Sequence, residues 1–257
     1  MGKIILNREG NIATVTLSNP EKLNALDVAM WNSITKTFNA LSKDKSIRAI
    51  IINGENENFA AGANIEEFQK VRKNAKEGIK YHSQIITPAL RAITKCIHPT
   101  IAAIEGVCVG GGLEIACSCD IRFATPDSRF GIPIKRLGFA LAPDEMQGLV
   151  QLIGLANTLE ILLEGHILNA QEAKEKGILN RIAQDVQKEA WICAKRIAEG
   201  APLAARTNKW LARYFANTNK PLTKKELRKA YAPLDSKDYQ EGVRSFLAKE
   251  KHEFLGK

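Results

Sequence analysis

Two short apolar runs constrain the fold of this chain more than any other feature. IRAIIIN (residues 47–53) and TIAAIEGVCV (residues 100–109) are rich in β-branched residues, and the first is too short for a helix. Runs of this kind are typical of strands buried on both faces of a parallel sheet. Segments with the 3.6-residue period of amphipathic helices separate them. The alternation predicts an α/β fold in which helices cover a parallel sheet.

The remaining patterns predict a hairpin, more helices and a helical tail. Segments 3–6 and 12–17 flank the turn Glu9-Gly10-Asn11, which favours a β-hairpin. Asp27 is the expected N-cap of a helix, and Asn169 of a later one. From about residue 186 onward only helical patterns occur. Other expected elements are helices over 81–97 and 146–155 and a short strand over 121–124.

Composition indicates an ordinary globular chain. Its 257 residues, with 45% hydrophobic and 25% charged, fit one large domain or a domain with an appendage. The first ten residues contain Arg8 and Glu9 and no long apolar core, so we expect neither a signal peptide nor a membrane span, and a cytoplasmic location. Cys117 and Cys119 lack the usual CxxC spacing, and no His lies beside them. We therefore expect buried reduced thiols and no metal site.

The formal net charge of +9 suggests an anionic partner. The densest basic runs, residues 70–80 and 223–229, have helical spacing and few aromatic residues. Solvated helix faces explain such runs better than a nucleic-acid surface. The net positive charge also fits a ligand that bears phosphate groups.

Three glycines, Gly110 to Gly112, follow the second buried run, at the strand end where ligands bind in α/β folds. No third spaced glycine and no Lys-Ser/Thr follow them, which excludes the dinucleotide and P-loop motifs. Such glycines let a backbone N–H approach a developing oxyanion. The loop FAAGAN (residues 59–64) could supply a second donor, although tight packing explains either loop alone. Glu114 stands among apolar residues, which would raise its pKa toward neutral.

Several motifs occur together in one order along the chain. They are NPEKLNALD, FAAGANIEEF, KCIHPTIAAIEGVCVGGGLEIACSCDIRFAT, RFGIP and the tail EGVRSFLAKEKHEFLGK. With them the chain resembles the crotonase (enoyl-CoA hydratase/isomerase) superfamily over nearly its whole length. The resemblance implies a spiral of ββα turns over residues 1–190, which would hold the acyl-CoA site. It also implies a helical region over residues 191–257 that would assemble homotrimers or hexamers.

The same resemblance implies a site for an acyl-CoA thioester, with coenzyme A present only as part of the substrate and no further cofactor. The backbone N–H groups of Ala63 and Gly111 would bind the thioester oxygen, and Glu114 would be an acid/base. The residues expected at coenzyme A are Lys22, Leu23, Ala25, Ala61, Asn64, Ile65, Lys251 and Phe254.

One position departs from the family pattern. Hydratases of this family usually use a second glutamate after RFGIP, where this chain has Ile134. The loss of a general acid/base typically costs about 10²–10⁴-fold in rate. Asp144, the expected helper, or Glu145 could substitute, although both are also good first-turn helix residues.

Four kinds of function follow from this departure. The first is an enoyl-CoA hydratase with Glu114 as its only family-type acid/base. The second is an enoyl-CoA isomerase, acyl-CoA decarboxylase or thioester hydrolase of the same fold. The third is an RNA-binding homologue, which only the basic segment 70–80 suggests. The fourth is a homologue without catalytic activity.

Overall fold

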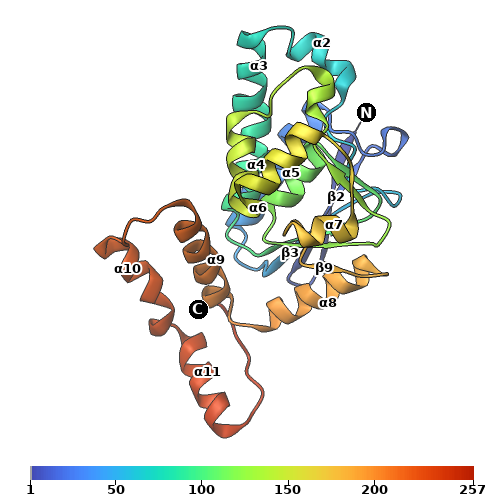
Figure 1. The fold of residues 1–257 in the computed structure, drawn as a ribbon. Coiled ribbons are helices and arrows are strands. Elements are labelled where there is room, and N and C mark those ends of the chain that lie inside the picture. The colour runs from blue at the N-terminus through green and yellow to red at the C-terminus, as the bar shows by residue number, and fades with distance from the viewer. Residues whose placement is uncertain (1) are drawn as a thin grey trace.

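The computed structural model describes residues 2–257, which form a six-stranded sheet in the order β1-β2-β3-β4-β6-β9. β1 and β2 form the expected antiparallel hairpin, and all the other neighbours in this sheet are parallel. Helices surround the strands in Figure 1. The strands are β1 (Lys3–Glu9), β2 (Ile12–Ser18), β3 (Ala49–Gly54), β4 (Thr100–Ile104), β6 (Ile121–Ala124) and β9 (Arg181–Ile182).

A second sheet has three strands, β5 (Val107–Val109), β7 (Arg129–Gly131) and β8 (Leu168–Asn169). The single strand expected over residues 100–109 is therefore wrong, because β4 belongs to the large sheet and β5 to the small one. Gly106 makes the turn between them with φ +52°, and a Cβ there would overlap the carbonyl oxygen of Glu57. Only glycine fits such a turn. Because β4 and β5 belong to different sheets, the end of β5 and the glycine triplet after it are directed toward residues 59–63.

The expected helix caps are confirmed. Asp27 accepts a hydrogen bond of 2.8 Å from the Met30 N–H at the start of α1 (Val28–Lys43). Asn169 and Glu172 form a capping box at the start of α7 (Ala170–Glu175).

The helix expected over residues 81–97 has three parts. It starts at the end of α3 (Ala75–Tyr81), continues as a π-helical segment, His82–Ile86, and ends as α4 (Thr87–Lys95). Such π-helical segments often occur at functional sites.

The helices around the site have bounds that differ from those the sequence predicts. α5 (Gly111–Ser118) begins within the glycine triplet, and α6 (Pro143–Glu164) exceeds the expected 146–155. Length and composition alone would let α6 cross a membrane. Gly154, with φ 76°, breaks the helix midway, and Glu145 is buried in its first turn. The short elements are η1 (Pro20–Lys22), η2 (Ile65–Glu67), α2 (Phe68–Val71) and η4 (Ile134–Leu137).

The C-terminal helices leave the core in Figure 1. α8 (Val186–Glu199) still packs on the large sheet, where Val186 and Ala190 join a core cluster with Ile101. The expected boundary after residue 190 thus falls inside α8. The helices that project are α9 (Pro202–Asn217), α10 (Lys224–Tyr231) and α11 (Lys237–Ala248), the last two joined by η5 (Ala232–Asp235).

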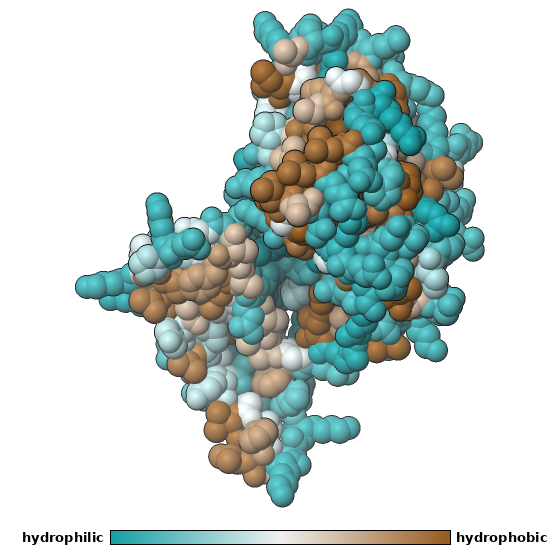
Figure 2. All heavy atoms as spheres, viewed as in Figure 1, coloured by the Kyte–Doolittle hydropathy of each residue, from teal (hydrophilic) through white to brown (hydrophobic). Residues whose placement is uncertain are grey.

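The projecting helices expose much apolar surface, which appears brown in Figure 2. α9 buries only Pro202 among its sixteen residues. The large exposed side chains of this region include Leu227, Tyr231, Leu234, Val243, Phe246 and Leu247. A second apolar stripe on α6 consists of Leu155, Leu159 and Leu163.

The cysteines behave as buried packing residues. Cys96, Cys108, Cys119 and Cys193 are buried, Cys117 is half-buried, and all are free thiols. Burial raises the pKa of the Cys117 and Cys119 thiols to about 12, so they are protonated and poorly reactive at neutral pH.

Candidate active site

Backbone pairing brings the two loops of the expected oxyanion site together. The Ala60 N–H donates to the Val107 carbonyl (2.9 Å), and the Val109 N–H donates to the Ala60 carbonyl (3.1 Å). Residues 59–61 therefore run beside β5, and Gly62 meets the glycine triplet. A Cβ on Gly62 would lie 3.4 Å from the Gly111 nitrogen, and the φ of Gly62 is +94°. Glycine is thus required where the loops touch.

Two backbone donors are left free at this contact. The Leu26 N–H donates to the Gly62 carbonyl (2.7 Å) and the Asn64 N–H to the Leu26 carbonyl (2.8 Å), which holds the loop on both sides of Ala63. Within residues 2–257 the N–H groups of Ala63 and Gly111 make no hydrogen bond. Gly111 opens α5, where the first N–H groups have no acceptor in the helix. Both groups therefore lie without an acceptor in the two loops that meet at Gly62.

Close packing fixes the position of the glycine triplet. The Gly110 N–H donates to the Gly131 carbonyl (2.8 Å). A Cβ on Gly111 would lie 2.8 Å from the Trp31 ring, and one on Gly112 would overlap the Ala60 carbonyl oxygen. A side chain at Gly111 would have to displace the buried Trp31 ring, and one at Gly112 would have to displace the backbone at Ala60.

Glu114 lies in the first turn of α5, three residues after Gly111. Burial raises the pKa of its carboxyl well above the ordinary value, and the negative charge of Glu145 raises it further. A carboxyl with such a pKa can hold a proton near neutral pH and release it to a substrate carbon. The acid/base role expected of Glu114 from the sequence stays a prediction, and its position and raised pKa are the observations on which a proposal can rest.

Asp144 and Glu145 are neighbours in the first turn of α6, but they face different surroundings. The Asp144 side chain is 44% exposed and pairs with Arg91 at 3.1 Å. The Glu145 side chain is 1% exposed and lies 2.7 Å from Nδ1 of His82. Both residues and Glu114 line one cavity of about 1260 Å³. Glu145 is thus the fully buried acid of this cavity, whereas Glu114 is half-buried and Asp144 is held in a surface ion pair.

The periodicity of the sequence indicates that Glu145, and not Asp144, faces the core. Glu145, Leu149 and Ile153 follow one another at four-residue intervals and are all buried on one face of α6. His82 was not singled out, because a lone His in an apolar helix has no distinguishing pattern. Ile134, at the start of η4, packs against the hydrophobic core.

Six of the residues expected at coenzyme A lie on two adjoining loops. The Ala61 N–H donates to the Leu23 carbonyl (2.9 Å), which joins the loops, and Lys22 pairs with Glu66 across them. Asn64 caps η2. The six are Lys22, Leu23, Ala25, Ala61, Asn64 and Ile65, of which Leu23 and Ile65 are large exposed apolar residues.

The two other residues expected at coenzyme A lie on the C-terminal tail. Phe254 stacks on His252 with ring centroids 4.3 Å apart. It lines an apolar cavity next to α9 and α11, and none of the six loop residues lines that cavity. Lys251 is exposed nearby on the tail.

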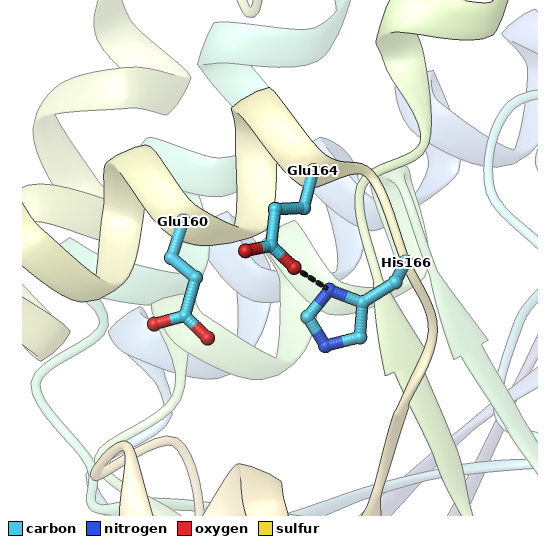
Figure 3. Close-up of side chains that lie close together, drawn as sticks. All are labelled: Glu160, Glu164 and His166. Atoms are coloured by element: carbon cyan, nitrogen blue, oxygen red, sulfur yellow. Dashed lines mark ion pairs between the residues drawn. The ribbon is translucent and has the colours of Figure 1, made fainter.

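Glu160, Glu164 and His166 form a separate cluster of potential metal ligands (Figure 3). Glu160 pairs with Lys176 at 2.6 Å, and Glu164 lies 3.1 Å from Nδ1 of His166. All three residues are partly or largely exposed. The ion pairs account for the cluster without a cation.

The spiral of strands and helices, with projecting C-terminal helices, is the α/β fold of the crotonases. A family model described as enoyl-CoA hydratase/isomerase matches residues 7–257. The short-chain-enoyl-CoA hydratase of Clostridium acetobutylicum is 32% identical over 212 residues, which cover 81% of this chain and 80% of that protein. A probable enoyl-CoA hydratase of Bacillus subtilis is 31% identical over the full length of both chains.

Among solved structures, an enoyl-CoA hydratase/carnithine racemase of Magnetospirillum magneticum has a TM-score of 0.95 and 43% sequence identity. The match covers 99% of this chain and 96% of that one. The chain belongs to the enoyl-CoA hydratase/isomerase family.

Proposed function

We propose that this protein is an enoyl-CoA hydratase, which adds water to the double bond of a 2-enoyl-CoA. The observation that supports this most is the position of Glu114, a carboxyl of raised pKa three residues beyond a free backbone donor. The hydratases to which the chain is similar point to the same reaction.

In this proposal the N–H groups of Ala63 and Gly111 bind the thioester oxygen. Attack of water on C3 breaks the C2–C3 π bond and moves charge onto that oxygen, where two fixed donors stabilise it. Glu114 then gives its proton to C2 as the thioester carbonyl re-forms. A second group must accept the proton that water loses, and Ile134 has no atom that can do so.

Ile134 is also the observation that favours the second candidate, an enoyl-CoA isomerase. A single carboxylate can take a proton from one carbon of the substrate and return it to another, with the same oxyanion donors. Acyl-CoA decarboxylation or thioester hydrolysis would likewise need only part of the hydratase machinery. RNA binding has less support, because α2 and α3 divide the basic run 70–80 and Arg72 lies between the rings of Phe68 and Phe139.

A panel of acyl-CoA thioesters incubated in D₂O tests the proposal. With crotonyl-CoA we expect loss of the conjugated enoyl absorbance and one deuterium at C2 of the 3-hydroxyacyl product. A shifted double bond without hydration would indicate the isomerase, and free coenzyme A would indicate the hydrolase. Either result, in the absence of hydration, contradicts the proposed function.

We also propose that the C-terminal helices assemble the protein into homotrimers or hexamers. Exposed apolar side chains on these helices, among them Phe246 (83% exposed) and Leu247 (77%), support this. Light scattering should give three or six times the 28.3 kDa of the chain. The double variant Phe246→Glu, Leu247→Glu should shift the mass toward one chain. A monomeric wild-type protein would contradict the proposal.

A further inference from the structure

We propose that Glu145, oriented by His82 and Arg72, is the second acid/base residue of this active site and accepts the proton of the attacking water. This inference rests on the proposed hydratase function. It places the second carboxylate on the first turn of α6, in place of the family position that Ile134 occupies.

The cavity is the first observation that supports this role. Glu145 and Glu114 line the same cavity, and their charges interact, since Glu145 helps to raise the pKa of Glu114. The Glu145 side chain is 1% exposed. A buried carboxylate beside a second carboxyl costs free energy that apolar residues in the same places would not. In the usual acid/base pair, the two carboxyls have different surroundings, so that one carboxyl keeps a proton and the other is ionised.

The contacts of His82 determine which of its nitrogens holds the proton. Nη1 of Arg72 lies 3.5 Å from Nε2 of His82, and Nδ1 of His82 lies 2.7 Å from Oε1 of Glu145. A guanidinium only donates hydrogen bonds, so Nε2 is the acceptor and Nδ1–H donates to Glu145. The carboxylate is thereby held as an acceptor. Its other oxygen, Oε2, makes no hydrogen bond within residues 2–257 and is free for a water molecule.

Aromatic contacts hold the orienting residues in place. The Arg72 guanidinium lies 3.9 Å from the ring centroid of Phe68 and 4.5 Å from that of Phe139. The His82 ring stacks on Phe139, with centroids 5.5 Å apart. His82 also begins the π-helical segment between α3 and α4. Four elements thus converge to orient one carboxylate: α2 with Arg72 at its end, the π-helical segment, the loop after η4, and α6.

The proposed step balances as follows. Oε2 of Glu145 takes one proton from water while the water oxygen bonds to C3. The π electrons of C2–C3 form the enolate, which takes the proton of Glu114 at C2. One water has then been added, with Glu145 protonated and Glu114 ionised. Exchange with solvent in the open cavity returns both carboxyls to their starting states.

The test compares two reactions of the same site. Hydration needs both carboxyls, whereas exchange of the C2 protons of butyryl-CoA with D₂O needs only Glu114 and the oxyanion donors. For Glu145→Gln we expect hydration of crotonyl-CoA to fall by about 10²–10⁴-fold and exchange to stay within a fewfold of wild type. His82→Gln should lower hydration less, again without loss of exchange.

Two further variants serve as comparisons. Glu164→Gln removes an exposed charge from the same helix and should leave both reactions unchanged. Asp144→Asn tests the neighbouring acid. The proposal is overturned if Glu145→Gln keeps full hydration, if it loses exchange together with hydration, or if Asp144→Asn alone gives the loss. A wild-type protein that exchanges C2 protons without hydration would refute the hydratase function itself.

Discussion

Glu114→Gln is expected to abolish hydration and C2 proton exchange together. The amide is nearly isosteric with the carboxyl but has no proton to give to C2, so we expect a fall in kcat of at least about 10²–10⁴-fold. Binding of a saturated acyl-CoA should change little, because the oxyanion donors belong to the backbone. Steady-state kinetics and calorimetric titration measure the two effects. An unchanged kcat would contradict the assignment of Glu114.

The same variant should also change the dependence of stability on pH. Because the pKa of Glu114 is raised in the folded state, the folded protein binds a proton more tightly than the unfolded chain does. This contribution to stability is complete below the unfolded pKa, about 4.3, and is lost as pH rises through the folded pKa. Glu114→Gln has no such loss. Its melting temperature should therefore rise relative to wild type as the pH increases above the unfolded pKa of a glutamate, about 4.3.

The difference between the two proteins reports Glu114 together with its electrostatic interaction with Glu145, because the other titrating groups of the cavity are present in both. Glu164→Gln is the matched control, since it removes an exposed carboxyl whose loss should add no such trend. Parallel stability curves for wild type and Glu114→Gln would contradict the raised pKa.

Gly112→Ala is the second change with a large expected effect. The new Cβ would overlap the Ala60 carbonyl oxygen and lie 2.9 Å from the Ala60 Cβ. The start of α5 cannot simply move away, because the Gly110 N–H is bonded to Gly131. Overpacking of this kind costs about 1–3 kcal/mol of stability. Displacement of the Gly111 donor should lower kcat by about 10²–10³-fold.

Gly148→Ala provides the comparison for this variant. Gly148 lies in α6, and a Cβ there meets no atom within 4 Å. Alanine should raise stability by about 0.5–1 kcal/mol, because glycine is a poor helix former. Thermal melts on both variants separate the effect of the added methyl group from that of its position, and crotonyl-CoA kinetics on Gly112→Ala measure the loss of kcat. If Gly112→Ala melts at the same temperature as Gly148→Ala, the overlap with Ala60 is relieved without loss of stability, which contradicts the prediction.

Sequence periodicity predicted most of the fold. The hairpin, α1, α7 and the helical C-terminal region follow from local patterns that burial and capping enforce directly. The break between β4 and β5 did not follow, because only Glu105 and Gly106 separate two apolar segments that belong to different sheets. The π-helical segment was missed because its side-chain pattern over five residues does not differ from that of an α-helix.

The site was predictable only where backbone geometry dictates residue type. Gly111 and Glu114 lie in one short motif, so the sequence places the donor and the acid together. Glu145 and His82 are 63 residues apart, and only the packing of α6 against the π-helical segment brings them into contact. Asp144 and Glu145 look equivalent in sequence, and which of them is buried depends on the direction in which the helix faces.

The turn at Gly106 has a consequence for how this enzyme could change. Because Ala60 pairs with β5 and Gly110 with Gly131, the segments that present Ala63 and Gly111 are both tied to the three-stranded sheet. The spacing of these two donors therefore does not depend on how that sheet sits against α6. In the proposed mechanism the side chains that move protons come from α5 and α6. Substitutions in α6 would then change which protons move without changing how the two backbone donors bind the thioester oxygen.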